Sequence, residues 1–507
     1  MATPLEYSSI ETIEDSVSCL RGAFISGKSR LVTWRKYYIQ RLYDLVKENE
    51  DRFYDALAKD MKKPRLEAFI GDISPVLEEC VYYLDNIDNL MKDKKVKARS
   101  RVTNATATNV IRKDALGLVL IFGAWNFPLQ LTLIPLVGAI AAGNTVIIKP
   151  SEISAYTSAL LTELFPLYMD SNMYRIVNGG VDESTALLTH HFDHIFYTGS
   201  TRVGKIVMTA AAKHLTPVTL ELGGKCPAIV TEDVDIDTVA QRIAFGKFYN
   251  GGQACVAADY VLIHESQLDA FIASFGRTIK KWFGDNPQNS QDFARMISDT
   301  HFDHVARLVN SRESGDIVIG GGMDRDEKYI APTLITNLDY SESVLMGDEI
   351  FGPVLPVLTF KKIRDAVNYV NKKHAPLALY IFSKNQKAID RILTTTQSGG
   401  VLINDTLMHQ AEYALPFGGI GHSGMGNYHG AKSFDTFTHE RSIMVKKQRL
   451  ESLMGVRYPP YTAKNLSLLR RLLSTHPWIY YYKIHKTGSR VSLILAIILI
   501  VFLRQRW

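Results

Sequence analysis

The stretch "NGGQACVAADYVLIH", residues 250–264, holds one cysteine, Cys255, among small residues. A thiolate is a strong nucleophile, and small neighbours leave room for a substrate carbonyl and for backbone N–H donors. The same surroundings suit a buried, inert cysteine, and a single unpaired cysteine is inert more often than reactive. On this stretch alone, the buried residue is the favoured interpretation.

Two other polar residues stand at the ends of apolar, β-branched runs. Glu221 in "LELGGKCP" precedes two glycines, where a carboxylate can serve as a general base with a raised pKa. Asn126 in "IFGAWNFP" lies between a predicted strand and a helix, where its amide can stabilise an oxyanion. Taken alone, each motif favours a simpler interpretation: a surface glutamate before a turn, and an asparagine that caps the next helix.

A turn with glycines follows a further strand in "FYTGSTRVGKIV". Gly199 and Gly204 lie between this strand and a helix, where small residues let backbone N–H groups approach a phosphate. The spacing is not GxGxxG. A dinucleotide-binding turn and an ordinary tight βα turn are therefore equally supported.

Alternating strand and helix patterns indicate what would position these residues. "LGLVLIFG", "LQLTLIPLVGAIAAG" and "NTVIIKP" predict strand, helix and strand, a βαβ unit with a parallel sheet. The alternation of strand and helix patterns continues along the chain, and residues 225–405 contain a second series of alternating strand and helix patterns. We predict an α/β fold with an open, doubly wound sheet and a second α/β domain. Polar residues and prolines within 116–148 argue against a membrane span there.

Composition and charge bound the class of protein. The 507 residues favour two or three domains, and the contents of 46% hydrophobic and 22% charged residues are typical of globular proteins. Four cysteines fit no zinc or disulfide pattern, so we expect a reducing compartment. The formal charge is +6, but residues 464–507 carry eight lysines and arginines and no acid, which leaves −2 for the rest. A near-neutral globular part gives nucleic-acid binding little support.

The C-terminal segment differs from the rest of the chain. Residues 463–473, "AKNLSLLRRLL", predict a basic amphipathic helix, and residues 491–503, "VSLILAIILIVFL", are uniformly apolar between two arginines. The apolar stretch would rise only about 20 Å as a helix, less than the about 30 Å of a bilayer core. Its terminal position and flanking arginines favour a membrane tail anchor, and an in-plane or intramolecular helix is the alternative.

Seven segments occur in the chain in this order: "WNFP", "AAGNTVIIKPSE", "YTGSTRVGKIV", "LELGGK", "GGQACVAADYVL", "EIFGPVLPV" and "PFGGIGHSGMG". Together they resemble the signature segments of the NAD(P)-dependent aldehyde dehydrogenases, and the resemblance covers residues 10–445. "ADYVL" after the cysteine, the short N-terminus and "RYPPY" at 457–461 resemble class 3 members of that family. With the apolar tail, the similarity is greatest to long-chain fatty aldehyde dehydrogenases of fungal type.

The resemblance implies roles for the polar residues. Cys255 would attack the aldehyde to give a thiohemiacetal and then a thioester, with Asn126 and the Cys255 backbone N–H holding the oxyanion. Glu221 is the first candidate for the base that activates water, and Glu349 of "EIFGP" is the second. The implied cofactor is NAD, with NADP as the alternative, and no metal is required. The implied cofactor contacts are Lys149, Glu152, Gly199, Ser200, Gly204, Glu349 and Phe351.

The chain departs from the family pattern near the nucleophile. Cys226 replaces the usual Ser or Asn, and we interpret it as a small core residue rather than a second oxidisable thiol. Gly252 and Ala254 replace residues that are commonly Ser and Thr, a change that would loosen the loop. Ala258 replaces a common Pro. None of these changes removes a catalytic group.

The family fold implies domains and partners as well. We expect a fatty aldehyde substrate, a homodimer and a membrane bound through the C-terminal helix, with the catalytic domain in the cytosol. The mitochondrial outer membrane is the expected location, and the endoplasmic reticulum and lipid droplets are the alternatives. A semialdehyde dehydrogenase and a catalytically silent scaffold are the alternative functions. We expect residues 1–222 to form the N-terminal helices and the dinucleotide-binding domain, with part of an oligomerisation arm near 95–112. Residues 223–410 would form the catalytic domain, and residues 411–445 the return segment and the rest of the arm. Residues 446–490 would be a basic amphipathic extension, and residues 491–503 the membrane-anchor helix.

Overall fold

The computed structural model divides the chain into two compact units, residues 1–92 with 113–440 and residues 93–112 with 441–507. The predicted anchor at 491–503 lies outside the described residues. Among the helices that are described, none is both long and apolar enough to cross a bilayer. The described residues are 5–98, 107–312, 314–339, 343–448, 451 and 455–473.

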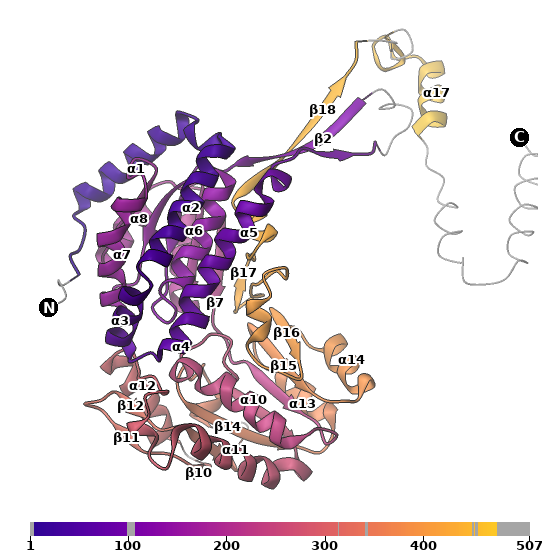
Figure 1. Cartoon of the computed structure of the whole chain (residues 1–507). Coiled ribbons are helices and arrows are strands. Elements are labelled where there is room, and N and C mark those ends of the chain that lie inside the picture. The colour runs from indigo at the N-terminus through magenta and orange to yellow at the C-terminus, as the bar shows by residue number, and fades with distance from the viewer. Residues whose placement is uncertain are drawn as a thin grey trace, which may run out of the picture. The chain divides into compact units, whose positions relative to one another are not determined.

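The first unit contains a doubly wound sheet near the N-terminus (Figure 1). Its strands are parallel except for β17, which pairs antiparallel with β7 at one edge. This arrangement confirms the predicted doubly wound architecture. Over the described residues the order is β17 (Gly424–Met425), β7 (Val218–Leu222), β6 (His194–Gly199), β3 (Leu118–Phe122), β4 (Thr145–Lys149) and β5 (Tyr174–Ile176).

Helices cover both faces of this sheet because its central strands are apolar on both sides. In β3, Val119 and Ile121 face one core, and Leu118 and Leu120 face the other. The first core is formed with α2 (Val32–Glu48), α3 (Glu50–Met61), α5 (Ser74–Leu90), α6 (Gln130–Ala142) and α7 (Ala155–Tyr168), and the second with α1 (Ile10–Ile25), α8 (Val181–Thr189) and α9 (Thr201–Ala212).

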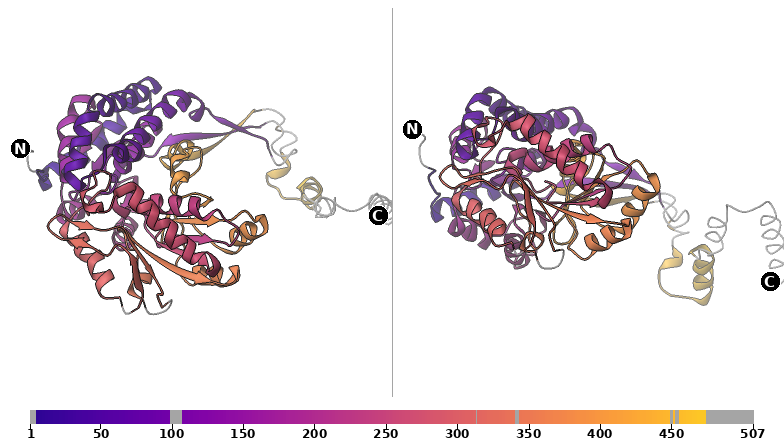
Figure 2. Two further views of the ribbon diagram at one scale, coloured as in Figure 1. Left: turned by 60° about the horizontal axis from the view of Figure 1, so that its bottom comes forward. Right: turned by 90° about the horizontal axis from the view of Figure 1, so that it is seen from below.

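A second α/β sheet forms a separate lobe of the same unit, drawn in rose to orange in Figure 2. All its strands are parallel except β10, as the second alternating set predicts. The order over the described residues is β10 (Asp316–Ile319), β13 (Thr333–Thr336), β14 (Val354–Phe360), β9 (Tyr260–His264), β8 (Pro227–Val230), β15 (Ala378–Phe382) and β16 (Gly400–Ile403). The helices are α10 (Ile236–Phe248) and α11 (Leu268–Phe283) on one face and α12 (Asp299–Asn310), α13 (Ile363–Asn371) and α14 (Gln386–Thr395) on the other.

Helix α6 accounts for much of the apolar stretch 116–148, whose composition raises the alternative of a membrane span. All of its residues are buried, and the helix is 13 residues long, which rises only about 20 Å. It packs between the first sheet and the N-terminal helices. The uniformly apolar composition thus reflects a core helix surrounded by protein.

The second unit contains a small sheet and a helix. Strand β1 (Lys94–Val96) pairs antiparallel with β2 (Ala107–Ala115), and β2 lies beside β18 (Thr438–Lys446). Helix α17 (Ala463–Leu473) coincides with the predicted amphipathic helix.

Candidate active site

The two sheets of the first unit direct their loops toward one region. The order of the first sheet reverses between β3 and β6, and ligands of such sheets bind beyond the carboxyl ends of the strands at this point. Asn126 follows β3, and Glu221 lies at the end of β7. In the second sheet, Cys255 precedes β9 and Glu349 precedes β14, which are neighbouring parallel strands.

The loop that carries Cys255 is held in a special backbone conformation. Asn250, Gly251 and Gly252 all have positive φ, and a turn closes with a 2.9 Å bond from the Ala257 N–H to the Ala254 carbonyl. Cys255 is partly exposed within this turn, against an apolar cluster. The cysteine is therefore accessible rather than a buried filler.

Gly252 tightens this loop instead of loosening it. Its φ is +78°, and a Cβ built there would overlap the carbonyl group of Gly352. Only glycine permits that approach of two backbones. The expected loosening at Gly252 is therefore wrong. Ala254 is buried, at 2% exposure, so it also packs closely.

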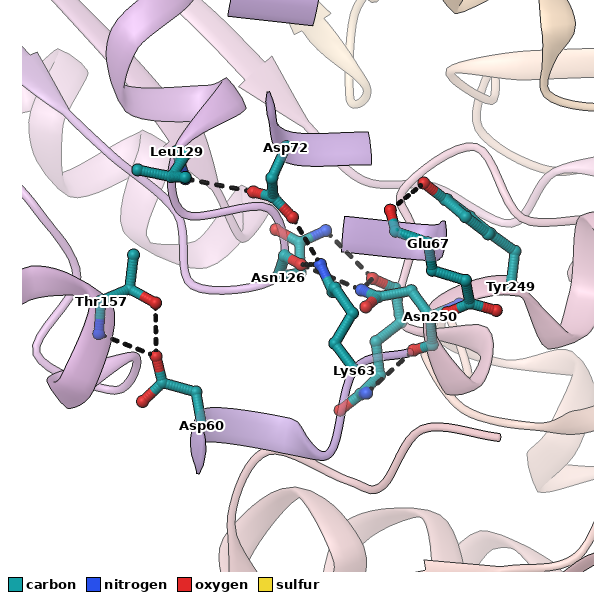
Figure 3. Close-up of polar contacts among 10 residues, drawn as sticks. Asp60, Lys63, Glu67, Asp72, Asn126, Leu129, Thr157, Tyr249 and Asn250 are labelled. Atoms are coloured by element: carbon teal, nitrogen blue, oxygen red, sulfur yellow. Dashed lines mark hydrogen bonds and ion pairs between the residues drawn. The ribbon is translucent and has the colours of Figure 1, made fainter. Parts of the chain in front are cut away.

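The side chain of Asn126 is tied to the cysteine loop (Figure 3). Its Nδ2 donates to the Gln253 carbonyl at 3.1 Å, and Asn250 Nδ2 donates to the same carbonyl at 3.0 Å. Helix α6 begins at Gln130 with Leu129 as its N-cap, so the helix-cap interpretation of Asn126 is wrong. An amide NH₂ carries two donors, and Gln253 uses one of them. The other is available for an oxyanion beside Cys255.

Glu221 is a buried carboxylate, not a surface residue. Its exposure is 3%, and neither carboxylate oxygen has a hydrogen-bond partner among the described residues. Burial raises its pKa well above the ordinary value. A carboxylate kept without partners is poised to take up a proton, which is what a general base requires.

Glu349 lies in a different environment, next to a buried cluster of charges. Lys225 Nζ is 2.6 Å and Lys247 Nζ is 3.3 Å from the Asp259 carboxylate. The Ile350 N–H donates to that carboxylate at 3.3 Å, so the cluster fixes the loop that carries Glu349. Burial and the Asp259 charge raise the pKa of Glu349 to about 8, although the Gly224 N–H and both lysines lower it.

The Cys255 thiol is close to both carboxylates. Although the residue is partly exposed, the protein around the thiol removes much of its water, and this desolvation, followed by the charges of Glu349 and Glu221, raises its pKa to about 12. The N–H groups of Cys255 and Val256 oppose this rise. The protein thus holds the resting cysteine as a thiol. A neighbouring base must accept the proton when the sulfur attacks a carbonyl.

Five of the predicted cofactor residues lie at or just beyond the carboxyl ends of β4 and β6: Lys149, Glu152, Gly199, Ser200 and Gly204. Lys149 Nζ forms an ion pair with Glu152 Oε2 at 2.6 Å, and Lys149 ends β4. Ser200 is the N-cap of α9 and accepts from the Val203 N–H. Gly204 is buried against Leu222, so α9 packs closely on β7. A helix N-terminus after a parallel strand fits a pyrophosphate.

Phe351 stands on the opposite side of this region, in the second lobe. Its φ is +52°, and its ring centroid lies 5.4 Å from that of Trp125 in an edge-on arrangement. Trp125 in turn meets the His301 ring at 4.6 Å. These aromatic contacts connect the loop after β3 to the loop before β14.

The structure also adds residues that sequence reasoning missed. Asn250 and Gln253 lie in the stretch around Cys255, and their amides were visible there as possible loop anchors. The pair Lys63–Asp72, which contacts the backbone of Asn126, has no signal in the sequence, because nothing in its spacing indicates a shared site.

Comparisons with known proteins identify the family. A model described as the aldehyde dehydrogenase family matches residues 6–443. The "aldehyde dehydrogenase, dimeric NADP-preferring" of Rattus norvegicus is 45% identical over 455 residues, which are 90% of this chain and 99% of the relative. The rat "aldehyde dehydrogenase family 3 member A2" is also 45% identical, over 90% of this chain and 93% of the relative.

Solved structures agree with this result. The substrate-bound state of Staphylococcus aureus AldH has a TM-score of 0.88 and 40% identity, and covers 91% of this chain and 99% of that one. The NAD+ complex of a Bacillus cereus aldehyde dehydrogenase has a TM-score of 0.78 and 26% identity, with 87% and 90% covered. The chain belongs to the aldehyde dehydrogenase family. The predicted class 3 resemblance is confirmed by the family 3 relatives, and the predicted nicotinamide cofactor, NAD or NADP, is that of the family.

Proposed function

We propose that this aldehyde dehydrogenase oxidises medium- to long-chain fatty aldehydes to fatty acids with NAD, and with NADP as the alternative cofactor. Three groups support this proposal: the partly exposed Cys255, the Asn126 amide that is hydrogen-bonded to the cysteine loop, and the buried Glu221 carboxylate, which has no hydrogen-bond partner among the described residues. These are a nucleophile, an oxyanion donor and a base. Cys255 packs against an apolar cluster of the second lobe, and this apolar environment supports an apolar substrate.

The first half of the reaction follows from the cysteine loop. Cys255 loses its proton to a neighbouring carboxylate and bonds to the aldehyde carbon, which gives a thiohemiacetal oxyanion. The free N–H of Asn126 Nδ2 and the Cys255 backbone N–H stabilise the developing charge. An oxidised nicotinamide held beside Glu349 and Phe351 would supply the acceptor for the hydride that leaves the former aldehyde carbon, and the thiohemiacetal would thereby become a thioester. The fixed loop keeps the sulfur in one position through this step.

The second half of the reaction releases the acid. A water attacks the thioester carbonyl while Glu221 takes the proton of that water. The carbon–sulfur bond then breaks, which releases the fatty acid and returns Cys255 as its thiolate. Glu221 is the preferred base because, within the described part of the chain, its carboxylate has no hydrogen bonds to lose, whereas Glu349 is held by the Gly224 N–H beside two lysines. Glu349 and Phe351 are then assigned to the nicotinamide ribose, and Lys149 with Glu152 to the adenosine ribose.

Turnover of hexadecanal tests this function. Wild-type protein should form NADH, and Cys255→Ala should abolish its formation, while Cys19→Ala serves as a control because Cys19 is a partly exposed cysteine on α1. Equal rates for wild type and Cys255→Ala would reject the nucleophile. Faster turnover of succinic semialdehyde than of hexadecanal would favour the semialdehyde alternative, and no turnover of any aldehyde would favour a silent scaffold.

We also propose a tail anchor at 491–503 and a homodimer. The apolar, arginine-flanked sequence supports the anchor, and the edge strand β18 of the second unit supports pairing with another copy. Deletion after Lys486 should release the protein from membranes, and persistent membrane binding would contradict the anchor. Sedimentation of the truncated protein measures the oligomeric state. A fluorescent fusion distinguishes the mitochondrial outer membrane, the proposed location, from the endoplasmic reticulum and lipid droplets.

A further inference from the structure

A buried ion pair lies behind the residue proposed to hold the oxyanion. Lys63 Nζ and Asp72 Oδ2 are 2.7 Å apart, and both side chains have 0% exposure. Removing two charges from water costs several kcal/mol per ion, and a buried pair often adds no net stability over apolar side chains of similar volume. Stability alone therefore does not account for this pair.

Lys63 and Asp72 form hydrogen bonds with the main chain on both sides of the turn that carries Asn126. Lys63 Nζ donates to the Asn126 carbonyl at 2.9 Å and lies 4.3 Å from the Phe127 ring centroid. The second oxygen of Asp72 accepts from the Leu129 N–H at 3.1 Å, at the start of α6. Because Pro128 has no N–H, these contacts hold the main-chain polar groups on either side of it.

The same carbonyl connects the ion pair to the nucleophile loop (Figure 3). Asn250 Nδ2 donates to the Asn126 carbonyl at 2.9 Å and to the Gln253 carbonyl at 3.0 Å. Asn126 Nδ2 donates to that second carbonyl as well. Both ends of Asn126, its carbonyl and its amide, are therefore fixed relative to the loop that ends in Cys255.

The turn that supplies Asp72 packs directly on this loop. Lys63 follows α3, and Asp72 lies in a π-helical turn, η2 (Phe69–Ile73). Such wide turns occur often at functional sites. Within η2, a Cβ on Gly71 would overlap the Tyr249 hydroxyl, so the turn lies against the residue before Asn250.

We propose that Lys63 and Asp72 are positioning residues that fix Asn126 as the oxyanion donor. The inference rests on the proposed function. Neither residue touches the reacting atoms. Lys63 fixes the position of the Asn126 backbone, Asp72 fixes the start of α6, and the Asn126 amide is thereby aimed at the oxyanion before the substrate arrives.

The test replaces both members, since either single change leaves one charge buried and unpaired. Lys63→Met with Asp72→Asn keeps an acceptor for the Leu129 N–H and removes the hydrogen bond from the Lys63 ammonium to the Asn126 carbonyl. We expect kcat for hexadecanal to fall by about 10- to 100-fold, less than the about 10²- to 10³-fold that removal of an oxyanion donor causes, because Asn126 is still present but less well positioned. The dissociation constant for NAD should not change. The matched control is Lys113→Met with Asp435→Asn, an ion pair between β2 and α15 (Ala431–Thr436), which should keep wild-type kcat.

A double-mutant cycle separates positioning from a general structural role. In an Asn126→Ala background, the Lys63 and Asp72 changes should lower kcat by less than about 2-fold, because the group that they position is gone. An equal loss in both backgrounds, or wild-type kcat in the first variant, would overturn the inference. If that variant does not fold, Lys63→Met with Asp72→Leu carries the same comparison. Wild-type turnover that Cys255→Ala abolishes establishes the proposed function separately in the same assay.

Discussion

The thiol of Cys226 donates a hydrogen bond to the main-chain carbonyl of Cys255, with 3.4 Å between sulfur and oxygen. Cys226 is fully buried, and its sulfur also accepts from the Ala378 N–H at 3.3 Å. The expectation of a small core residue thus agrees with its burial, and the residue also joins the nucleophile loop to β15. Together with Tyr380, whose hydroxyl donates to the Val256 carbonyl, it fixes the loop from the side of the second sheet.

Cys226→Ala should lower kcat by about 3- to 10-fold, because it leaves the Cys255 carbonyl without its donor. Cys226→Ser retains a donor and an acceptor and should stay close to wild type. Steady-state NADH formation from hexadecanal measures both variants, with thermal unfolding as a check on the fold. If the Ser and Ala variants were equally slow, the hydrogen bond would not be the reason for the loss.

Glu221→Gln should slow thioester hydrolysis far more than acylation, because Glu349, the other carboxylate that acts on the Cys255 thiol, can still accept the thiol proton. The variant keeps the volume of the side chain and removes the base, so turnover should fall by about 10²- to 10⁴-fold. Rapid mixing should then show a burst of NADH equal to the enzyme concentration, followed by a slow phase. Glu349→Gln is the matched comparison and should weaken NAD binding without producing a burst. The opposite pattern would assign the hydrolytic base to Glu349.

Gly252→Ser should inactivate the enzyme, because its Cβ would overlap the Gly352 carbonyl and its φ of +78° is strained for any side chain. Gly251→Ser is the control. Its φ is also positive, at +63°, but the nearest atom to its Cβ would be 3.4 Å away, so only the backbone strain of about 1–3 kcal/mol applies. Activity and thermal unfolding of the two variants measure the difference. Comparable activity in both would show that the two backbones can separate at little cost.

Glu79 should make the stability of the protein depend on pH. Burial raises its pKa to about 7, although the Gly430 N–H and the Ser433 hydroxyl lower it. Because the folded state binds this proton more tightly than the unfolded state, its contribution is complete below about pH 4.5 and is lost as the pH rises through about 7. Relative to Glu79→Gln, wild type should lose about 3 kcal/mol of unfolding free energy between these limits.

Urea unfolding at a series of pH values tests this dependence on Glu79. Glu78→Gln is the control, because Glu78 is the exposed neighbour on α5. That variant should follow the pH profile of the wild type. A constant difference between wild type and Glu79→Gln across the range would mean that the carboxyl group has the same pKa in both states.

The sequence by itself determined the elements and the chemistry of single residues. Continuous apolar runs such as 118–122 predict buried parallel strands, because a strand covered on both faces has no polar side. The order of the family segments indicated Cys255, Asn126 and Glu221 together. Local spacing can predict strands, turns and helix caps, since each of them depends mainly on residues that are neighbours in the chain.

Only the tertiary structure decided the environments of these residues. Glu221 is buried, without a hydrogen-bond partner among the described residues, in a strand that pairs with β17, about 200 residues later in the chain. Gly252 is required because a distant backbone, at Gly352, approaches it. The contact between Lys63 and Asn126 joins positions that are 63 residues apart. Burial, pKa and positioning depend on contacts between distant segments, and no local pattern in one sequence encodes which segments will meet.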